Sequence, residues 1–385
     1  MNICHVITRL IVGGAQENTL LTCEGLRAKG HQVTLITGPD SGPEGSLLAE
    51  ARAGGYEVRV LPTLRRAIKP LADLRAWRSM ASVFAEIKPD VVHTHSSKAG
   101  ILGRLAAHSA GVPIVVHTIH GMSFNRTQCR LVQGLYRKAE QYCGRFTDRF
   151  ICVADAMTDQ AVAAGLAARE KFVTVYSGMR TEWYDPTQYK RGSVRQSWGF
   201  ADDAIVVCTV ARLFRDKGYE QLIPTMAAAV ERVPKLRFVW VGDGAQREVY
   251  ERRLEELGLR SHVHLTGLLS PAKVPEVLAG ADILVHASQW EGLPRTAVQA
   301  LLMQCPVISF DIDGAPEVVV EGKTGKLVPL NDIDRLTEAM VSLAGDAEGR
   351  KGMGAAGREL CLKRFDHNVM VDAIEKVYRE LHESG

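Results

Sequence analysis

Short runs of apolar and β-branched residues alternate with helical patterns along the whole chain. In the first half the predicted strands are NICHVITRL, HQVTLITG, EVRVLP, DVVHTH, IVVHTIHG, RFICVA and FVTVYSG, with helices expected over 16–29, 71–87, 99–110 and 131–146. A second series follows, made of AIVVCTVARL, RFVWVGDG, HVHLTG, DILVHAS, PVISFD and GKLVP, again with helices between the strands. This alternation is typical of parallel sheets covered by helices.

The polar, turn-rich stretch over residues 178–203 interrupts the rhythm. Because 385 residues also exceed the usual size of one core, we predict two domains, 1–178 and 179–364, joined by this stretch. The amphipathic helix expected over 365–385 is a candidate to pack back on the first domain. The predicted class is α/β, with two Rossmann-like domains facing each other across a cleft, and ligands are expected at the carboxyl ends of the strands.

Charge is distributed unevenly along the chain, although the formal net charge is only +3. Residues 1–178 carry 21 Lys and Arg against 14 Asp and Glu, and residues 60–150 carry 14 against 5. Such a basic region suits a phospholipid surface, a pyrophosphate-linked acceptor or nucleic acid, and a solvated face without a partner is the alternative.

The eight cysteines form no CxxC pair, and no group of cysteines and histidines has the spacing of a zinc site. We expect reduced thiols in a cytoplasmic protein. The start, MNICHVITRLIVGGAQ, lacks the basic leader and cleavage site of a signal peptide, and no run of about 18 apolar residues predicts a membrane span. Peripheral attachment at the inner face of the plasma membrane stays open.

Several glycine loops follow predicted strands and could approach phosphate or a nucleotide. Gly13 and Gly14 precede a helix whose N-terminus could bind an anion, but the full GxGxxG of dinucleotide-binding proteins is absent. The loops VGDG and LTGL, with Gly242, Gly267 and Leu268, could likewise approach a base or could be simple turns.

The segment VARLFRDKG places two cations at a strand end, Arg212 and, five residues on, Lys217. Fixed cations at such a loop suit a diphosphate whose charge grows when its bond to a sugar breaks. Arg215 is a competing candidate, and surface solvation is the alternative for each.

Four histidines, His93, His95, His117 and His120, occupy two neighbouring strand ends. A metal site must be considered because His-x-His can chelate, but no carboxylate stands near in sequence and a metal is not expected. His120, which precedes Gly121, is the better candidate for catalysis or substrate contact.

The stretch EGLPRTAVQ puts Glu291 in a loop before a helix and Gln299 inside that helix. Pro294 suits the first helical turn, where a missing N–H costs little. Glu291 can then reach sugar hydroxyls while loop N–H groups hold phosphate.

The motif Glu291-Gly292-Leu293-Pro294 through Gln299 resembles the retaining glycosyltransferases of family 4, which have the GT-B fold. GGAQENTLL, PDVVHTHSSKAGILGRLAA, HTIHG, VARLFRDKG and GAPEVV are similar to that family as well, so the resemblance covers nearly the whole chain. The chain departs from the family at Gln299, where a glutamate usually holds the ribose hydroxyls.

The resemblance implies that the first domain is the acceptor side and the second binds the nucleotide sugar. It implies catalytic roles for His120, Glu291, Arg212 and Lys217. The implied donor-binding residues are Gly13, Gly14, Arg212, Lys217, Gly242, Gly267, Leu268, Glu291, Gly292, Leu293, Pro294 and Gln299. Neither a metal nor a cofactor is implied, since the nucleotide sugar is the substrate and the cations take the place of a metal.

The implied activity is transfer of a hexosyl or N-acetylhexosaminyl unit from a UDP-linked sugar, with retention, to a glycan or polyprenyl-linked acceptor of a cell-surface polysaccharide or lipopolysaccharide. The basic region over 65–149 suits an anionic membrane surface, and nucleic acid is not expected as a partner. A UDP-sugar 2-epimerase and a catalytically weak partner subunit are the alternatives, while a dehydrogenase lacks its glycine fingerprint.

Overall fold

The computed structural model describes residues 1–40, 45–124 and 128–384. They form two compact units, one made of Met1–Gly178 with His367–Gly385 and the other of Met179–Asp366. Each unit has its own sheet and its own apolar core, so each is described by itself.

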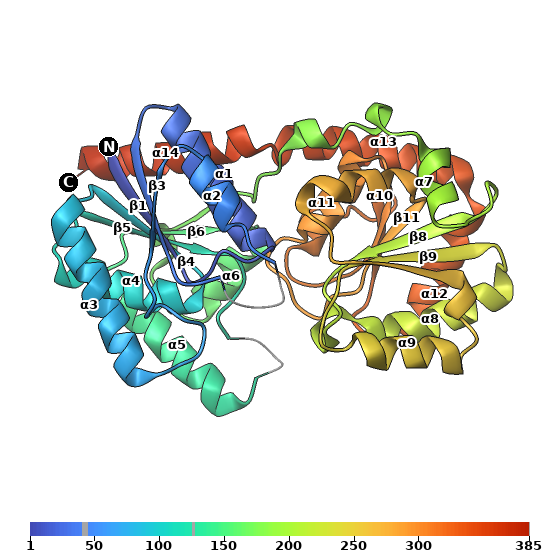
Figure 1. Cartoon of the computed structure of the whole chain (residues 1–385), viewed down its shortest axis with the longest axis horizontal. Coiled ribbons are helices and arrows are strands. Elements are labelled where there is room, and N and C mark those ends of the chain that lie inside the picture. Colours follow the sequence, from blue (N-terminus) through green and yellow to red (C-terminus); the bar gives the residue numbers. More distant parts are fainter. Residues whose placement is uncertain (41–44, 125–127, 385) are drawn as a thin grey trace. The chain divides into compact units, whose positions relative to one another are not determined.

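The first unit is a parallel sheet with helices on both faces (Figure 1). Its strands run in the order β3-β2-β1-β4-β5-β6-β7. The strand bounds are β1 Asn2–Ile7, β2 Gln32–Thr37, β3 Glu57–Val60, β4 Val91–His95, β5 Ile114–Ile119, β6 Arg149–Cys152 and β7 Phe172–Thr174. The helix bounds are α1 Gly14–Ala28, α2 Leu48–Ala53, α3 Pro70–Ile87, α4 Ser97–Ser109, α5 Arg130–Gly144, α6 Asp155–Ala163 and α14 His367–Ser384.

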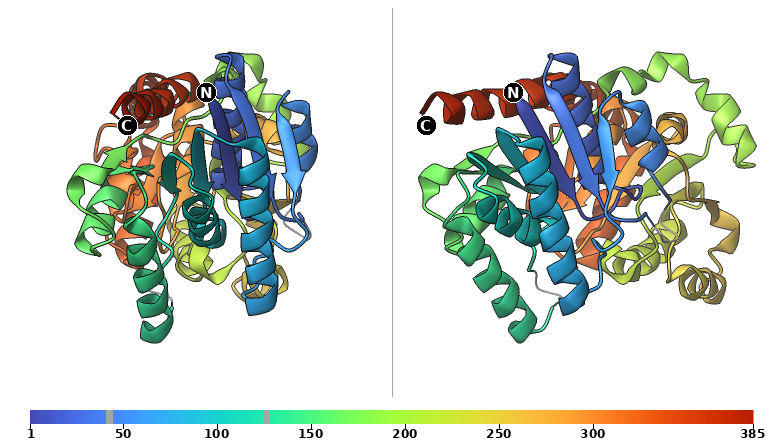
Figure 2. Two further views of the ribbon diagram at one scale, coloured as in Figure 1. Left: turned by 90° about the vertical axis from the view of Figure 1, so that its left-hand side faces the viewer. Right: turned by 60° about the vertical axis from the view of Figure 1, so that its left-hand side comes forward.

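The two faces of this sheet are covered by different helices. Helices α1 and α14 lie on one face, and α3, α4 and α5 lie on the other (Figure 1). In both views of Figure 2 the final helix runs beside the first strands, although nearly the whole chain separates them in sequence. Gly25 of α1 permits this close packing, because a Cβ there would lie 2.6 Å from Val371 Cγ2 of α14.

The second unit repeats the architecture with six strands in the order β10-β9-β8-β11-β12-β13. The strand bounds are β8 Ile205–Val210, β9 Leu236–Val241, β10 Val263–Gly267, β11 Ile283–His286, β12 Val307–Phe310 and β13 Gly325–Val328. The helix bounds are α7 Arg191–Ser197, α8 Tyr219–Arg232, α9 Arg247–Glu256, α10 Val274–Gly280, α11 Arg295–Leu302, α12 Ile333–Gly345 and α13 Ala347–Arg364. The α/β class with two Rossmann-like units is therefore confirmed.

One helix was not predicted. The stretch 178–203, which was expected to be a polar, turn-rich passage between the domains, contains the helix α7. This helix belongs to the second unit because buried Arg195 pairs with Asp282 (Nη2–Oδ2 2.5 Å) and donates to the carbonyl of Gly280 (2.9 Å). Ionic contacts between residues far apart in sequence thus stabilise a helix that its polar sequence does not predict.

Candidate active site

The carboxyl ends of β8, β9 and β10 are joined by backbone hydrogen bonds. The amide of Leu213, after β8, donates to the carbonyl of Asp243, after β9 (3.1 Å), and the amide of Gly242 donates to the carbonyl of Gly267 (2.9 Å). Gly242 has φ 137°, and a Cβ at this position would lie 2.2 Å from the carbonyl oxygen of Ala211. Only glycine fits there. The strand-end glycines identified in the sequence therefore hold these loops together.

The loop after β8 also contacts the loop after β11. Gly218 follows a short 3₁₀ turn over Arg215–Lys217, and its φ is 77°. A Cβ on Gly218 would lie 1.8 Å from the carbonyl oxygen of Ala287, while the amide of Gln289 donates to the carbonyl of Asp216 (2.9 Å). This close approach brings two sequence motifs, RDKG and EGLP, to one place.

Lys217 and Glu291 form an ion pair at that place. Lys217 Nζ lies 2.7 Å from Glu291 Oε1, and His286 Nε2, from the end of β11, lies 3.4 Å from the same oxygen. The backbone amide of Glu291 donates to Asp313 Oδ2 (2.8 Å). Asp313 has φ 48°, a strained value that is often found at functional sites. Carboxylate, ammonium and imidazole therefore meet at the strand ends of β8, β11 and β12.

The Glu291 carboxylate stays ionised although it is largely buried. Burial raises its pKa, but the Lys217 ammonium and the His286 ring lower the pKa more, so that it lies well below the ordinary value. The group is thus a fixed negative charge and a hydrogen-bond acceptor at neutral pH.

Arg212 follows β8 and is half-buried. Its guanidinium carbon lies 4.9 Å from the centre of the Phe214 ring, a cation–π contact that orients the side chain without neutralising it. The backbone amide of Arg212 borders Gly242, since a Cβ on that glycine would be 3.5 Å from it. Arg212 and Lys217 therefore lie in one loop, which supplies the two predicted cations.

Helix α11 begins directly after the EGLP motif. Pro294 is the residue before the helix rather than part of its first turn, which corrects the predicted position by one residue. Gly292 and Leu293 lie in the preceding loop, where the carbonyl of Gly292 accepts from the amide of Gly314 (3.1 Å). Gln299 lies inside the helix and is 6% exposed. Leu268, after β10, is 42% exposed and lies at the surface.

The other predicted site residues belong to the first unit. Gly13 precedes α1, and Gly14 is the first residue of that helix. His120 follows β5 directly and is half-buried. Its Nε2 lies 3.0 Å from Nδ1 of His95, which is fully buried at the end of β4.

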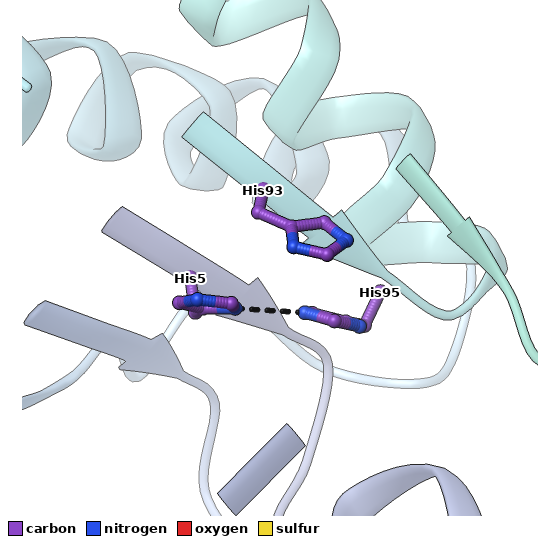
Figure 3. Close-up of side chains that lie close together, drawn as sticks. All are labelled: His5, His93 and His95. Carbon is purple, nitrogen blue, oxygen red and sulfur yellow. Dashed lines mark hydrogen bonds between the residues drawn. The ribbon is translucent and has the colours of Figure 1, made fainter. Parts of the chain in front are cut away.

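His93 and His95 share one side of β4, while His117 of β5 lies apart from them. His117 Nδ1 lies 2.9 Å from Thr94 Oγ1. A fifth histidine, His5 of β1, joins His93 and His95 in the core, as Figure 3 shows.

Within the described ranges, His5, His93 and His95 are the one group of three side chains whose ligand atoms lie close enough together to hold a metal ion. Their ligand nitrogens lie within 4.8 Å of one another. Two of the three rings, however, already bond to groups outside the trio: His93 contacts the Tyr378 hydroxyl and Thr118 Oγ1 (2.6 Å to Nε2), and His95 contacts His120 (3.0 Å). We therefore interpret the cluster as a hydrogen-bonded core.

Sequence reasoning missed His286, Asp313 and His5. His286 ends β11, one loop before the EGLP helix, and Asp313 lies in the loop after β12, so a position at a strand end was the available signal for both. His5 lies inside β1 and carries no such signal, because its contacts depend on how separate strands align.

Comparison with known proteins gives two family matches. Residues 13–178 match the glycosyl transferase 4-like domain, and residues 190–360 match the glycosyl transferases group 1. The matches cover β2 to β7 of the first unit and β8 to β13 of the second, with the loops that follow these strands.

Several relatives match over nearly the whole chain. A UDP-Gal:alpha-D-GlcNAc-diphosphoundecaprenol alpha-1,3-galactosyltransferase of Escherichia coli is 30% identical over 99% of this chain and 97% of its own. The putative glycosyltransferase EpsD of Bacillus subtilis is 28% identical over 83% of each. Among solved structures, Anabaena Alr3699/HepE in complex with UDP-glucose aligns with a TM-score of 0.84 at 22% identity, covering 98% of this chain and 99% of that one.

Proposed function

This chain belongs to the group 1 glycosyltransferases of family 4, which have the GT-B fold, and from that membership we propose a specific reaction for it. The enzyme is a hexosyltransferase that uses a nucleotide sugar. We propose that it moves a hexosyl or N-acetylhexosaminyl unit from a UDP-linked donor, with retention, to a glycan or lipid-linked acceptor of a cell-surface polysaccharide.

The proposed donor and acceptor are supported by the names of the relatives. The Escherichia coli protein is named for UDP-Gal as donor and for a diphosphoundecaprenol-linked sugar as acceptor. The Anabaena structure was solved with UDP and glucose, among other complexes. UDP-galactose is therefore the first donor to test.

The observation that carries the proposal is the Lys217–Glu291 pair in the second unit. An ammonium has three N–H donors, of which one bonds Glu291, so Lys217 can also donate to a phosphate oxygen. Arg212, in the same loop, adds a second cation for the diphosphate. Glu291, kept ionised, accepts hydrogen bonds from sugar hydroxyls.

The proposed step breaks the bond between the anomeric carbon and the diphosphate oxygen, whose electron pair leaves with the diphosphate. The acceptor hydroxyl oxygen bonds to the anomeric carbon on the same face, and its proton passes to the departing phosphate oxygen. Arg212 and Lys217 stabilise the negative charge that develops on the diphosphate.

A donor screen tests this function directly. Purified protein is incubated with UDP-galactose, UDP-glucose, UDP-N-acetylglucosamine and GDP-mannose, each with a polyprenyl diphosphate-linked N-acetylglucosamine. We expect UDP release with one UDP-sugar and an α-linked product by NMR. A β-linked product, or turnover with GDP-mannose alone, would refute the proposal. NMR of each donor without acceptor also detects 2-epimerisation.

We further propose that the first unit contacts an anionic membrane surface. Leu131 and Leu135 of α5 are 83% and 65% exposed, and Leu71 of α3 is 74% exposed. Basic side chains accompany them in the region over 65–149, such as Arg130 and Lys138. Exposed leucines beside cations suit the boundary between lipid headgroups and acyl chains. Among the described residues, none of the helices is long and apolar enough to cross a membrane.

A further inference from the structure

Three histidines in the first unit form a continuous hydrogen-bonded line. Nδ1 of His5 lies 2.9 Å from Nε2 of His95, and Nδ1 of His95 lies 3.0 Å from Nε2 of His120. The rings of His5 and His95 are nearly parallel, with 14° between their planes, and Figure 3 shows the bond that joins them. The line therefore runs from the core of the sheet at β1 to the residue after β5.

Both inner rings are neutral. Burial lowers the pKa of His5 to about 3, and burial, followed by the neighbouring histidines, lowers the pKa of His95 well below its ordinary value. A neutral imidazole carries one N–H and one bare nitrogen. Each of the two hydrogen bonds needs one N–H donor, and His95 has only one N–H to share between them. The two bonds must therefore be donated in the same direction, either from His5 towards His120 or from His120 towards His5.

His5, at the buried end of the line, determines the direction of donation. Nε2 of His5 is buried, and within the described part of the chain it has no hydrogen-bond partner. Buried N–H groups without an acceptor are rare in folded proteins. Nε2 is therefore the bare nitrogen, and the proton of His5 is on Nδ1, from which it donates to His95. His95 in turn donates from Nδ1 to Nε2 of His120.

We propose that His5 and His95 are positioning residues, which hold His120 as a neutral imidazole with its proton on Nδ1. His120 then acts as a hydrogen-bond donor to a hydroxyl of the donor sugar and not as a general base. Because His95 donates to Nε2, any polar contact of His120 with the sugar uses Nδ1. This role rests on the proposed function and on the catalytic role that the family resemblance implies for His120.

His93 provides a matched control within the same core. It is as buried as His95, and their ring centres are 4.3 Å apart, yet its bonds go to Tyr378 and Thr118 and not to the line. Replacing His93 disturbs the same packing without removing a proton donor from the line.

The test measures the tautomer of His120 in the full chain labelled with ¹⁵N-histidine. Two-bond ¹H–¹⁵N correlation spectra report which nitrogen carries the proton, and the signals of His120 are assigned by their loss in His120→Asn. We expect the proton on Nδ1 in the unmodified protein. A proton on Nε2 would overturn the proposal without the need for any variant in the core.

Substitutions at His95 test the coupling. His95→Leu removes the donor to Nε2 of His120, so we expect the proton of His120 to move to Nε2 and kcat to fall about tenfold with the donor KM little changed. Asparagine places an amide N–H near the position of Nδ1, so His95→Asn should restore both the tautomer and kcat. His93→Asn should leave the tautomer unchanged.

The outcomes separate this inference from the proposed function. An unchanged tautomer in folded His95→Leu, with transfer lost in His120→Asn, would refute the positioning role alone. A shifted tautomer with normal transfer in His120→Asn would leave the coupling intact and remove His120 from the proposed function.

Discussion

Lys217 and Glu291 show how two residues 74 positions apart come to share one site. The sequence indicated both, because each follows a strand and parallel strands present their carboxyl ends at one edge. Their direct ion pair was not predictable, since it depends on the close approach of Gly218 to Ala287. His286 and Asp313 escaped prediction for the same reason: their distances to Glu291 are properties of packing and not of spacing.

Removing the Lys217 ammonium is expected to slow sugar transfer strongly. In Lys217→Ala, the charge that develops on the diphosphate loses a donor, and kcat/KM should fall by about 10²- to 10³-fold, the usual effect of losing one stabilising donor. Arg215→Ala is the matched control, because Arg215 lies in the same 3₁₀ turn but is exposed. Steady-state UDP release measures both. An equal fall in kcat/KM in both variants would mean that the loss of any positive charge in this turn slows transfer, and would contradict a specific role of Lys217.

Gln299 stands where the family resemblance implies a glutamate, and its buried place in α11 leaves little room for solvent to compensate. A carboxylate accepts hydrogen bonds from hydroxyls about twice as strongly as a neutral amide. Gln299→Glu should therefore bind UDP about tenfold more tightly, as measured by calorimetry. Gln299→Leu, which has no acceptor, should weaken binding. The claim about this residue is lost if both variants bind UDP like the unmodified protein.

At the scale of elements, alternating strands and helices were predictable because each apolar run must be covered on both faces of a parallel sheet. Helix α7 was not, because its polar sequence is stabilised by Arg195 and Asp282 across 87 positions. For the final helix, the amphipathic pattern predicted the element, whereas its docking on α1 depends on the space left by Gly25.

An ionic cluster around Glu375 joins α14 to the residues that follow α1, and the packing of α14 should therefore depend on pH. Glu375 bonds Lys29 (2.8 Å), His31 (3.0 Å) and Arg379, and these bonds, Lys29 first, lower its pKa to about 2 although burial raises it. Its folded pKa lies below the unfolded value, so this stabilisation is present above pH 4.5 and is lost as the pH falls towards 2.

The shift corresponds to about 3 kcal/mol of unfolding free energy. Glu375→Gln should therefore be less stable by up to about that amount in urea unfolding at pH 7, and the difference should shrink between pH 4.5 and pH 2. Glu380→Gln, on the same helix and half-exposed, is the control. A difference that stays constant down to pH 2 would contradict the ionic account.

At the scale of the whole molecule, the basic residues gather in the first unit and the overall charge hides this asymmetry. The protein should float with vesicles that contain anionic phosphatidylglycerol at low salt, and less at high salt, because screening weakens the attraction. Leu131→Ser with Leu135→Ser should reduce flotation several-fold. Val249→Ser, at a residue of α9 that is 51% exposed, is the control. Equal binding to neutral vesicles would contradict an electrostatic contribution.

The division of the chain has a consequence for its biosynthesis. The second unit is one continuous segment, whereas the first is built from residues 1–178 and from 367 onward. A ribosome delivers the chain from its N-terminus, so the second unit can complete its core while the first still lacks the helix that covers α1. Until the 18 residues of α14 have been synthesised, the apolar surface of the first unit that α14 covers therefore stays exposed to solvent.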